Sequence, residues 1–141
     1  MDEFLTPKHC VSNHLHQTAR AVNRVYSEEM RPIGLKRSQY SILGYLQKLG
    51  VAQLTELADL LFMDRTTLSR NLKPLQKQGL ITVTPSELDR RAKELRLTDE
   101  GKALFKDATK YWRRAQKRIL DAFGAENWSK LEASLKTLRK N

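Results

Sequence analysis

The sequence predicts a mainly α-helical fold with one small β-hairpin, and three observations support this prediction. Apolar residues recur at helical spacing through most of the 141 residues. Within 54–80, two amphipathic stretches are separated only by a very short turn. Short β-branched or alternating runs at 80–84 and 93–97 then interrupt the helical spacing, as the strands of a hairpin do. We therefore expect a helix-turn-helix followed by a hairpin, with long helices before and after them in the chain.

The composition is typical of a soluble, helix-rich protein of one domain, with 40% hydrophobic and 30% charged residues. No run approaches the ~20 apolar residues that a membrane span needs, and no apolar segment follows the acidic start MDEF. We therefore expect a cytoplasmic protein without a membrane partner. The single cysteine, Cys10, excludes an intramolecular disulfide and fits a reducing compartment.

The net charge of +10 indicates a polyanionic partner, either nucleic acid or an anionic membrane. Residues 63–97 hold eight basic and four acidic residues, so the excess is centred on the helix-turn-helix and the hairpin. A helix that lies on a membrane needs bulky apolar residues that are free to insert. Here the leucines of the second helix are needed to pack on the first helix, so nucleic acid is the favoured partner.

Two helices are expected before the helix-turn-helix. Residues 1–7 lack periodicity, and a long helix at about 8–31 ends before Pro32. A second helix at 39–49, capped by Ser38, is apolar around most of its circumference and is therefore expected to be buried. Gly44 inside it costs about 1 kcal/mol of helix propensity relative to alanine, which indicates that a neighbour packs closely there.

The helix-turn-helix itself is predicted from two apolar stripes, Leu54, Leu57, Ala58 and Leu61 in the first helix and Leu68, Leu72 and Leu75 in the second. Asp64 can cap the second helix, and Phe62 stands in the turn, where a left-handed backbone is easiest for glycine. Pro74 predicts a bend, or last turns that run separately from the rest of the helix. The face opposite the second stripe is basic and rich in hydroxyl groups. The alternative is an ordinary αα-hairpin whose basic face contacts only solvent.

The hairpin at 80–97 has a long basic tip that contains Asp89, Arg90 and Arg91. A helix-turn-helix followed by a basic hairpin is a winged helix, and this combination is more specific than either part. The alternative for the tip is a solvated turn. Arg90 and Arg91 are the candidates for a DNA contact, and Asp89 is able to hold one of them by a charge-assisted pair.

Two helices complete the chain, one that is capped by Thr98 and another at about 126–139. Together with the first helix, they carry more apolar surface than the central part can cover, which predicts a homodimer. The alternative is a monomer in which these helices finish the core. We interpret the lysine-rich face at 102–117 as a surface that is exposed to solvent.

The expected DNA contacts follow from the winged helix. The start of the second helix of the motif would enter the major groove, and the wing would reach the adjacent minor groove, which attracts arginine where it is narrow. Polar groups at the start of the preceding helix could bind phosphate. The predicted DNA-binding residues are Ser38, Gln39, Arg65, Thr66, Thr67, Ser69, Arg70, Lys73, Arg90 and Arg91.

These motifs resemble the MarR family of winged-helix regulators. The resemblance is carried by RPIGLKRSQYSIL at 31–43, LTELADLLFMDRTTLSRNLKPLQKQGLI at 54–81, the wing at 89–91 and LTDEG at 97–101. It implies one domain over 1–141, in which about 8–31 and about 99–141 are dimerisation helices and about 36–98 is the winged helix-turn-helix DNA-binding part. It also implies a homodimeric repressor of a palindromic operator in double-stranded DNA, which a small, often aromatic or phenolic, effector releases. In relatives the effector lies between the dimerisation helices and the winged helix, where the candidates here are His16, Arg20, Arg24, Tyr40 and Tyr45.

Other functions stay open at this point. Cys10 and His14 stand four residues apart, so a thiol- or metal-responsive regulator is possible, although a metal site needs more ligands than this segment offers. A protein that coats DNA without reading its sequence is a second alternative. No catalytic triad, metal-ligand cluster or glycine-rich phosphate loop is present, so no enzyme activity, catalytic residue, metal or cofactor is predicted.

Overall fold

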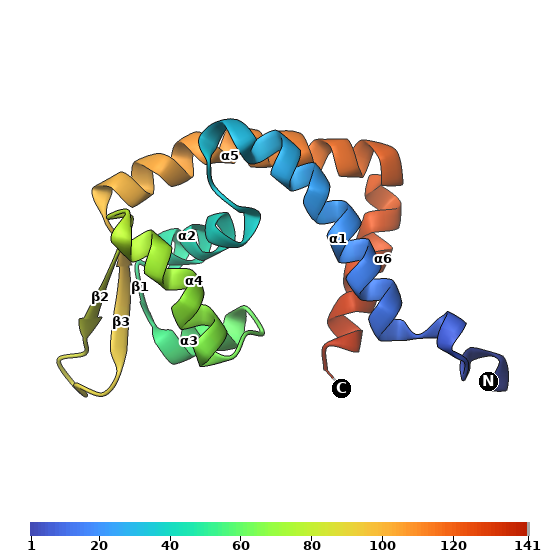
Figure 1. The fold of residues 1–141 in the computed structure, drawn as a ribbon, viewed down its shortest axis with the longest axis horizontal. Coiled ribbons are helices and arrows are strands. Elements are labelled where there is room, and N and C mark those ends of the chain that lie inside the picture. The colour runs from blue at the N-terminus through green and yellow to red at the C-terminus, as the bar shows by residue number, and fades with distance from the viewer. Residues whose placement is uncertain (141) are drawn as a thin grey trace. The chain divides into compact units, whose positions relative to one another are not determined.

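The computed structural model describes residues 1–140 and confirms a mainly helical fold with a small antiparallel sheet (Figure 1). The chain divides into two compact units, Ile33–Lys110 and Met1–Pro32 with Tyr111–Asn141. The elements in chain order are α1 Val11–Met30, α2 Arg37–Leu49, β1 Val51–Gln53, α3 Leu54–Leu60, α4 Arg65–Lys77, β2 Ile81–Pro85, β3 Lys93–Leu97, α5 Asp99–Phe123 and α6 Ala125–Leu138. Short 3₁₀ turns lie at Asp2–Phe4, Pro7–His9 and Arg31–Ile33.

The central unit, Ile33–Lys110, is built around leucines that face inward from α2, α3 and α4. The side chains of Leu43, Leu57 and Leu68 have no exposed surface, and Leu95 of β3 is equally buried. These residues occupy the apolar stripes that the sequence predicts, because helical spacing places them on one face of each helix. Figure 1 shows the hairpin of β2 and β3 extending away from these helices.

The sheet has three strands in the order β1-β3-β2, all antiparallel. Ala52 of β1 pairs with Leu95, and Leu95 pairs on its other side with Val83 of β2. The strand β1 is absent from the sequence prediction, because a run of three residues is too short to show alternation. It joins the sheet because β3 offers a free edge once the hairpin has formed.

The start of α2 differs from the prediction. The helix begins at Arg37, so Ser38 lies inside the first turn and does not cap it. The Oε1 atom of Gln39 instead accepts a hydrogen bond from the backbone N–H of Lys36 at 3.0 Å. A glutamine in the first turn is long enough to reach back to this amide, which Ser38 at its observed position does not do. The expected close neighbour of Gly44 is Phe105 of α5, whose ring edge lies 3.3 Å from where a Cβ atom would stand.

The helix-turn-helix agrees with the prediction in most details. Phe62 adopts a φ of 51° in the turn between α3 and α4, so this aromatic residue holds the left-handed backbone that usually favours glycine. The helix α4 runs through Pro74 as one element, so its last turns do not form a separate helix. Its buried face consists of Leu68, Leu72 and Leu75.

The junction of the wing with α5 is tightly packed. The Oγ1 atom of Thr98 accepts a hydrogen bond from the Gly101 N–H at 3.0 Å, which confirms the predicted cap, and it donates to the Gly79 carbonyl at 2.6 Å. The Thr98 N–H donates to the Leu80 carbonyl at 3.1 Å. These bonds tie the end of β3 and the start of α5 to the segment that leads from α4 into β2.

The second unit consists of α1, the later part of α5, and α6. The rings of Tyr26 and Trp112 lie 6.5 Å apart, and Arg118 bonds to both Glu28 and Glu29 at 3.0 and 3.1 Å. Hydrogen bonds to these two carboxylates raise the pKa of the Arg118 guanidinium above its ordinary value. No residue of α6 is buried. Among residues 1–140, no helix is long and apolar enough to cross a membrane.

Candidate nucleic-acid interface

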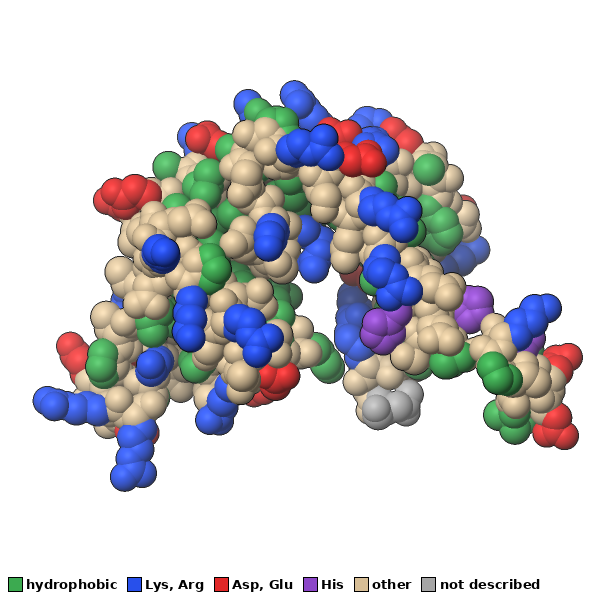
Figure 2. Space-filling model, viewed as in Figure 1, with side chains coloured by type: hydrophobic (Ala, Val, Ile, Leu, Met, Phe, Trp, Pro, Cys, Tyr) green, Lys and Arg blue, Asp and Glu red, His purple; other side chains and the backbone are tan. Residues whose placement is uncertain are grey.

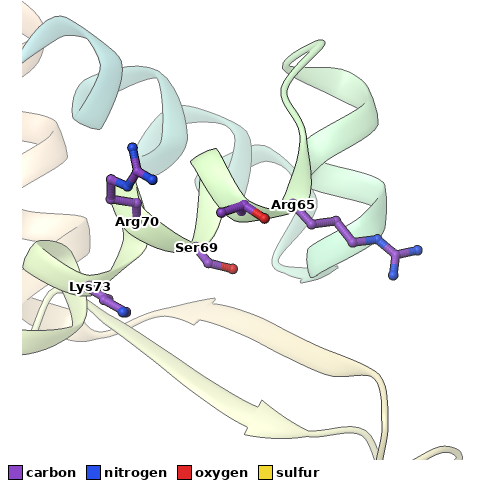
Figure 3. Close-up of a pocket in the computed structure, with 5 residues that line it drawn as sticks. Arg65, Ser69, Arg70 and Lys73 are labelled. Atoms are coloured by element: carbon purple, nitrogen blue, oxygen red, sulfur yellow. The ribbon is translucent and has the colours of Figure 1, made fainter.

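The outer face of α4 is basic and contains a shallow depression. An open depression of about 360 Å³ is lined by Arg65, Thr66, Ser69, Arg70 and Lys73, and none of these lining residues is acidic. Figure 3 shows Arg65 projecting from the start of the helix, with Ser69 and Lys73 one turn apart along it. Since the leucines on the opposite face are buried, the cationic face is the one that α4 presents to solvent.

Asp64 caps this helix and organises its first turn. Its Oδ1 atom accepts a hydrogen bond from the Thr67 N–H at 2.7 Å, and its Oδ2 atom accepts one from the Thr67 hydroxyl at 3.0 Å. The backbone N–H of Thr67 contributes most to lowering the pKa of the Asp64 carboxyl below its ordinary value, followed by the Thr67 hydroxyl. The Thr67 hydroxyl, which was expected to face a base, is therefore already engaged in the cap.

The lowered pKa of Asp64 predicts a specific dependence of stability on pH. Because the folded state has the lower pKa, the capping contribution is fully present above the pKa of an unfolded aspartate. It is lost as the pH falls below about 4, through the lower pKa of the folded state. We expect Asp64→Ala to lower the thermal midpoint at neutral pH, and the difference from the wild type to shrink on acidification. Asp64→Ser, which caps without titrating, should keep most of the neutral-pH stability. A constant difference from pH 7 to pH 2 in calorimetry would contradict this assignment.

The tip of the wing is a hydrogen-bonded turn between β2 and β3. Ser86 is 2% exposed; its N–H donates to the Ala92 carbonyl at 2.9 Å, and its Oγ atom accepts from the Leu88 N–H at 3.3 Å. The Asp89 Oδ1 atom accepts from the backbone N–H of Arg91 at 3.0 Å. The partner of Asp89 in the structure is thus the backbone of Arg91 and not an arginine side chain, because a short side chain at this point of a turn reaches the amide two residues on. Both arginines at the tip are exposed.

Basic side chains gather over α4 and the hairpin on the face that Figure 2 shows. The remaining DNA-contact candidates, Ser38 and Gln39, lie half-buried in the first turn of α2, and Gln39 already uses its Oε1 atom in the cap. All predicted DNA-binding residues therefore belong to the one compact unit of Ile33–Lys110.

The effector candidates belong to both units. On α2, Tyr40 is 8% exposed, stacks on Phe105 at 4.9 Å between ring centroids and shares a 3.1 Å hydrogen bond with Thr109. Tyr45 of the same helix is half-buried. The other three candidates, His16, Arg20 and Arg24, are exposed on α1.

Cys10 lies at the start of α1 and is half-buried. The nearby His14 bonds through its Nε2 atom to the Lys8 carbonyl at 3.0 Å, which occupies one ring nitrogen. Within residues 1–140, no group of three or more His, Cys, Asp or Glu side chains could hold a metal ion.

One feature of the wing is absent from the prediction. Leu88 at its tip is 98% exposed, the largest value among the exposed large hydrophobic side chains of the described chain. The signal in the sequence is an apolar residue within the polar run PSELDRR.

A helix-turn-helix with a basic second helix, followed by a hairpin with a basic tip, defines a winged-helix DNA-binding protein. The model of the MarR family matches residues 33–92. The uncharacterized HTH-type transcriptional regulator YybA of Bacillus subtilis (strain 168) is 31% identical over 124 residues, covering 87% of this chain and 82% of that protein. The chain belongs to the MarR family and is a DNA-binding transcriptional regulator, since the members of this family are transcription factors and not enzymes.

Solved structures give the same result. The M. tuberculosis transcriptional regulator MosR in complex with DNA aligns with a TM-score of 0.83 at 29% identity, over 92% of each chain. The transcriptional repressor CouR bound to a 23-mer DNA duplex also aligns with a TM-score of 0.83, at 28% identity over 94% of each chain.

Proposed function

We propose that this regulator acts as a homodimer that binds a palindromic operator, placing α4 in the major groove and the wing in the minor groove. The observation that carries this proposal is the depression on α4, in which three cationic side chains and two hydroxyl groups gather without an acidic neighbour in its lining. A polyanion that offers hydrogen-bond acceptors matches this chemistry.

The residues divide by the group they would contact. Thr66, Ser69 and Arg70 are proposed to face base edges, and Arg65 and Lys73 to bind phosphates. Thr67 would contact a base through its methyl group, because its hydroxyl bonds to Asp64. Phosphate contacts by Ser38 and Gln39 are a further part of the proposal.

Arg91 tests the role of the wing. Arg91→Ala is expected to weaken operator binding and to lower the slope of log K against log salt by about one contact. The change should leave the thermal midpoint nearly unaltered, because the side chain is exposed and the structural bond is made by its backbone N–H. Fluorescence anisotropy over a salt series measures both quantities. If the Arg91→Ala protein binds the operator as the wild type does, the wing does not contact DNA.

Dimerisation is supported by apolar surface in the unit of the terminal helices. Val11 and Leu15 on α1 are 59% and 40% exposed, and Leu131 and Leu138 on α6 are 38% and 43% exposed. A second copy of the chain would cover these residues, since helices with uncovered apolar stripes associate. The alternative is a monomer in which this surface stays in water.

A dimer with two-fold symmetry predicts a symmetric operator. Two reading helices should enter successive major grooves about 34 Å apart, so footprinting should protect two half-sites about one DNA turn apart. Sedimentation of the free protein should give twice the mass of the chain. A footprint over one unsymmetrical half-site would exclude this arrangement.

Competition separates a specific regulator from a protein that only coats DNA. A specific regulator keeps its operator in a large excess of random duplex at moderate salt, whereas a coating protein exchanges onto the competitor. The operator is obtained by selection from the genomic DNA of the host.

The repressor role and release by a small aromatic or phenolic molecule are proposed from the family resemblance. Tyr40, Tyr45, His16, Arg20 and Arg24 are the candidate contacts for that molecule. Response of DNA binding to oxidants or metals through Cys10 is the second candidate, favoured only by the nearby histidine, and Cys10→Ser tests it. Cytoplasmic location is expected because the proposed partner is the genomic DNA.

A further inference from the structure

Leu88 is presented to solvent by a turn that is held by backbone and side-chain hydrogen bonds. Its side chain is 98% exposed, although Ser86, two residues earlier, is 2% exposed. The Leu88 N–H donates to the Ser86 Oγ atom, and Asp89 holds the turn through the Arg91 N–H. The backbone therefore fixes where Leu88 stands, two residues before the first wing arginine.

If the wing enters a minor groove, an apolar side chain at this position can contact the walls and the floor of the groove. The walls of the groove are the C–H faces of deoxyribose, which an isobutyl group can contact while it displaces water. The floor over an A·T pair carries only acceptors, whereas a G·C pair adds the N2 amino group of guanine. A leucine cannot accept a hydrogen bond from this amino group and would cover it, which leaves a desolvated donor without a partner.

We propose that Leu88 is a specificity-determining residue of the wing, which enters the minor groove beside Arg90 and Arg91 and selects A·T pairs by excluding the guanine N2 amino group. This inference rests on the proposed DNA-binding function. It adds to that function the recognition of base pairs by an apolar side chain. The arginines supply attraction to the negative potential of the groove, and Leu88 supplies discrimination that does not depend on charge.

The test uses a duplex selected from a randomised library with the wild-type protein, altered only at the base pairs beneath the wing. Exchange of adenine for 2,6-diaminopurine adds the N2 amino group to an A·T pair. Exchange of guanine for inosine removes the same group from a G·C pair. We expect each added amino group to weaken wild-type binding by about 5- to 100-fold, which is the range for a mismatched base pair. In a duplex weakened by a G·C pair beneath the wing, exchange of guanine for inosine should restore the affinity.

Two variants isolate the side chain. Leu88→Ser should reduce the penalty for the amino group to less than about threefold and leave the salt slope unchanged, because no charge is lost. Leu88→Asn provides an acceptor and should favour the pairs that carry the amino group over plain A·T pairs. Leu49→Ser, a change of an exposed leucine on α2, is the matched control and should bind every duplex as the wild type does.

The outcomes are distinguishable. If Leu88→Ser keeps the full penalty while Arg91→Ala weakens binding, the wing contacts DNA but the inference about Leu88 is wrong. If neither variant alters binding of any duplex, the placement of the wing in the groove fails together with the inference. A wild-type protein that binds amino-bearing and amino-free duplexes equally also overturns it. Circular dichroism and the thermal midpoint of each variant establish that the protein under test is folded.

Discussion

Arg70→Ala is expected to weaken binding to the selected operator by about 10- to 100-fold and to relax the preference at one base pair of each half-site. Arg70 lines the depression on α4, and its guanidinium can donate two hydrogen bonds to the O6 and N7 acceptors of one guanine. Removing such a bidentate contact costs about 1–3 kcal/mol for each contact. The measurement is a titration of the operator and of duplexes that carry each alternative base pair.

Arg70→Lys is the matched control for this prediction. Lysine keeps the positive charge but lacks the planar fork, so the preference for the base pair should fall while most of the salt dependence stays. Since Arg70 is exposed, neither variant should shift the thermal midpoint by more than a small amount. Equal loss of affinity on every duplex, with no loss of preference, would assign Arg70 to a phosphate instead of a base.

Gly101→Ala is expected to destabilise the protein, although alanine is the better helix former by about 1 kcal/mol. Gly101 is buried in the first turn of α5, and a Cβ atom there would stand 2.1 Å from the Leu80 carbonyl oxygen and 3.3 Å from the Leu97 Cδ2 atom. That oxygen also accepts the Thr98 N–H, so it cannot move without breaking the junction between the wing and α5. Overpacking of this kind costs about 1–3 kcal/mol and occasionally more. We therefore expect a net loss of stability in urea unfolding and a lower thermal midpoint.

Gly44→Ala provides the comparison for Gly101. Its Cβ atom would stand 3.3 Å from the edge of the Phe105 ring, a side chain that can turn slightly, and no backbone atom from outside α2 lies as close among the described residues. Its effect on stability should therefore be clearly smaller than that of Gly101→Ala. Unfolding curves of the two variants that coincide would show that the Leu80 carbonyl yields more readily than the geometry indicates.

Much of this architecture is predictable from the sequence, because it depends on interactions between residues that are close in the chain. The apolar stripes of α3 and α4 follow from helical spacing, which places every third or fourth residue on one face. Asp64 caps α4, and Thr98 caps α5, through bonds to amides three residues on. The sequence therefore determined the helix-turn-helix, the wing and the basic face of α4.

The tertiary structure decided features that depend on residues far apart in the chain, or on a choice among several local bonds. β1 exists because β3 offers it an edge 41 or more residues away, as the pairing of Gln53 with Glu94 shows. Close packing of Gly101 against the Leu80 carbonyl and the exposure of Leu88 likewise depend on the folded junction and turn.

The other differences from the prediction arise where neighbouring polar groups compete for the same hydrogen-bond partner. Gln39, and not Ser38, satisfies the amide at the start of α2, and Asp89 bonds to a backbone amide that is nearer than an arginine side chain. A sequence shows which groups are able to bond, whereas only the folded backbone determines which partner is within reach.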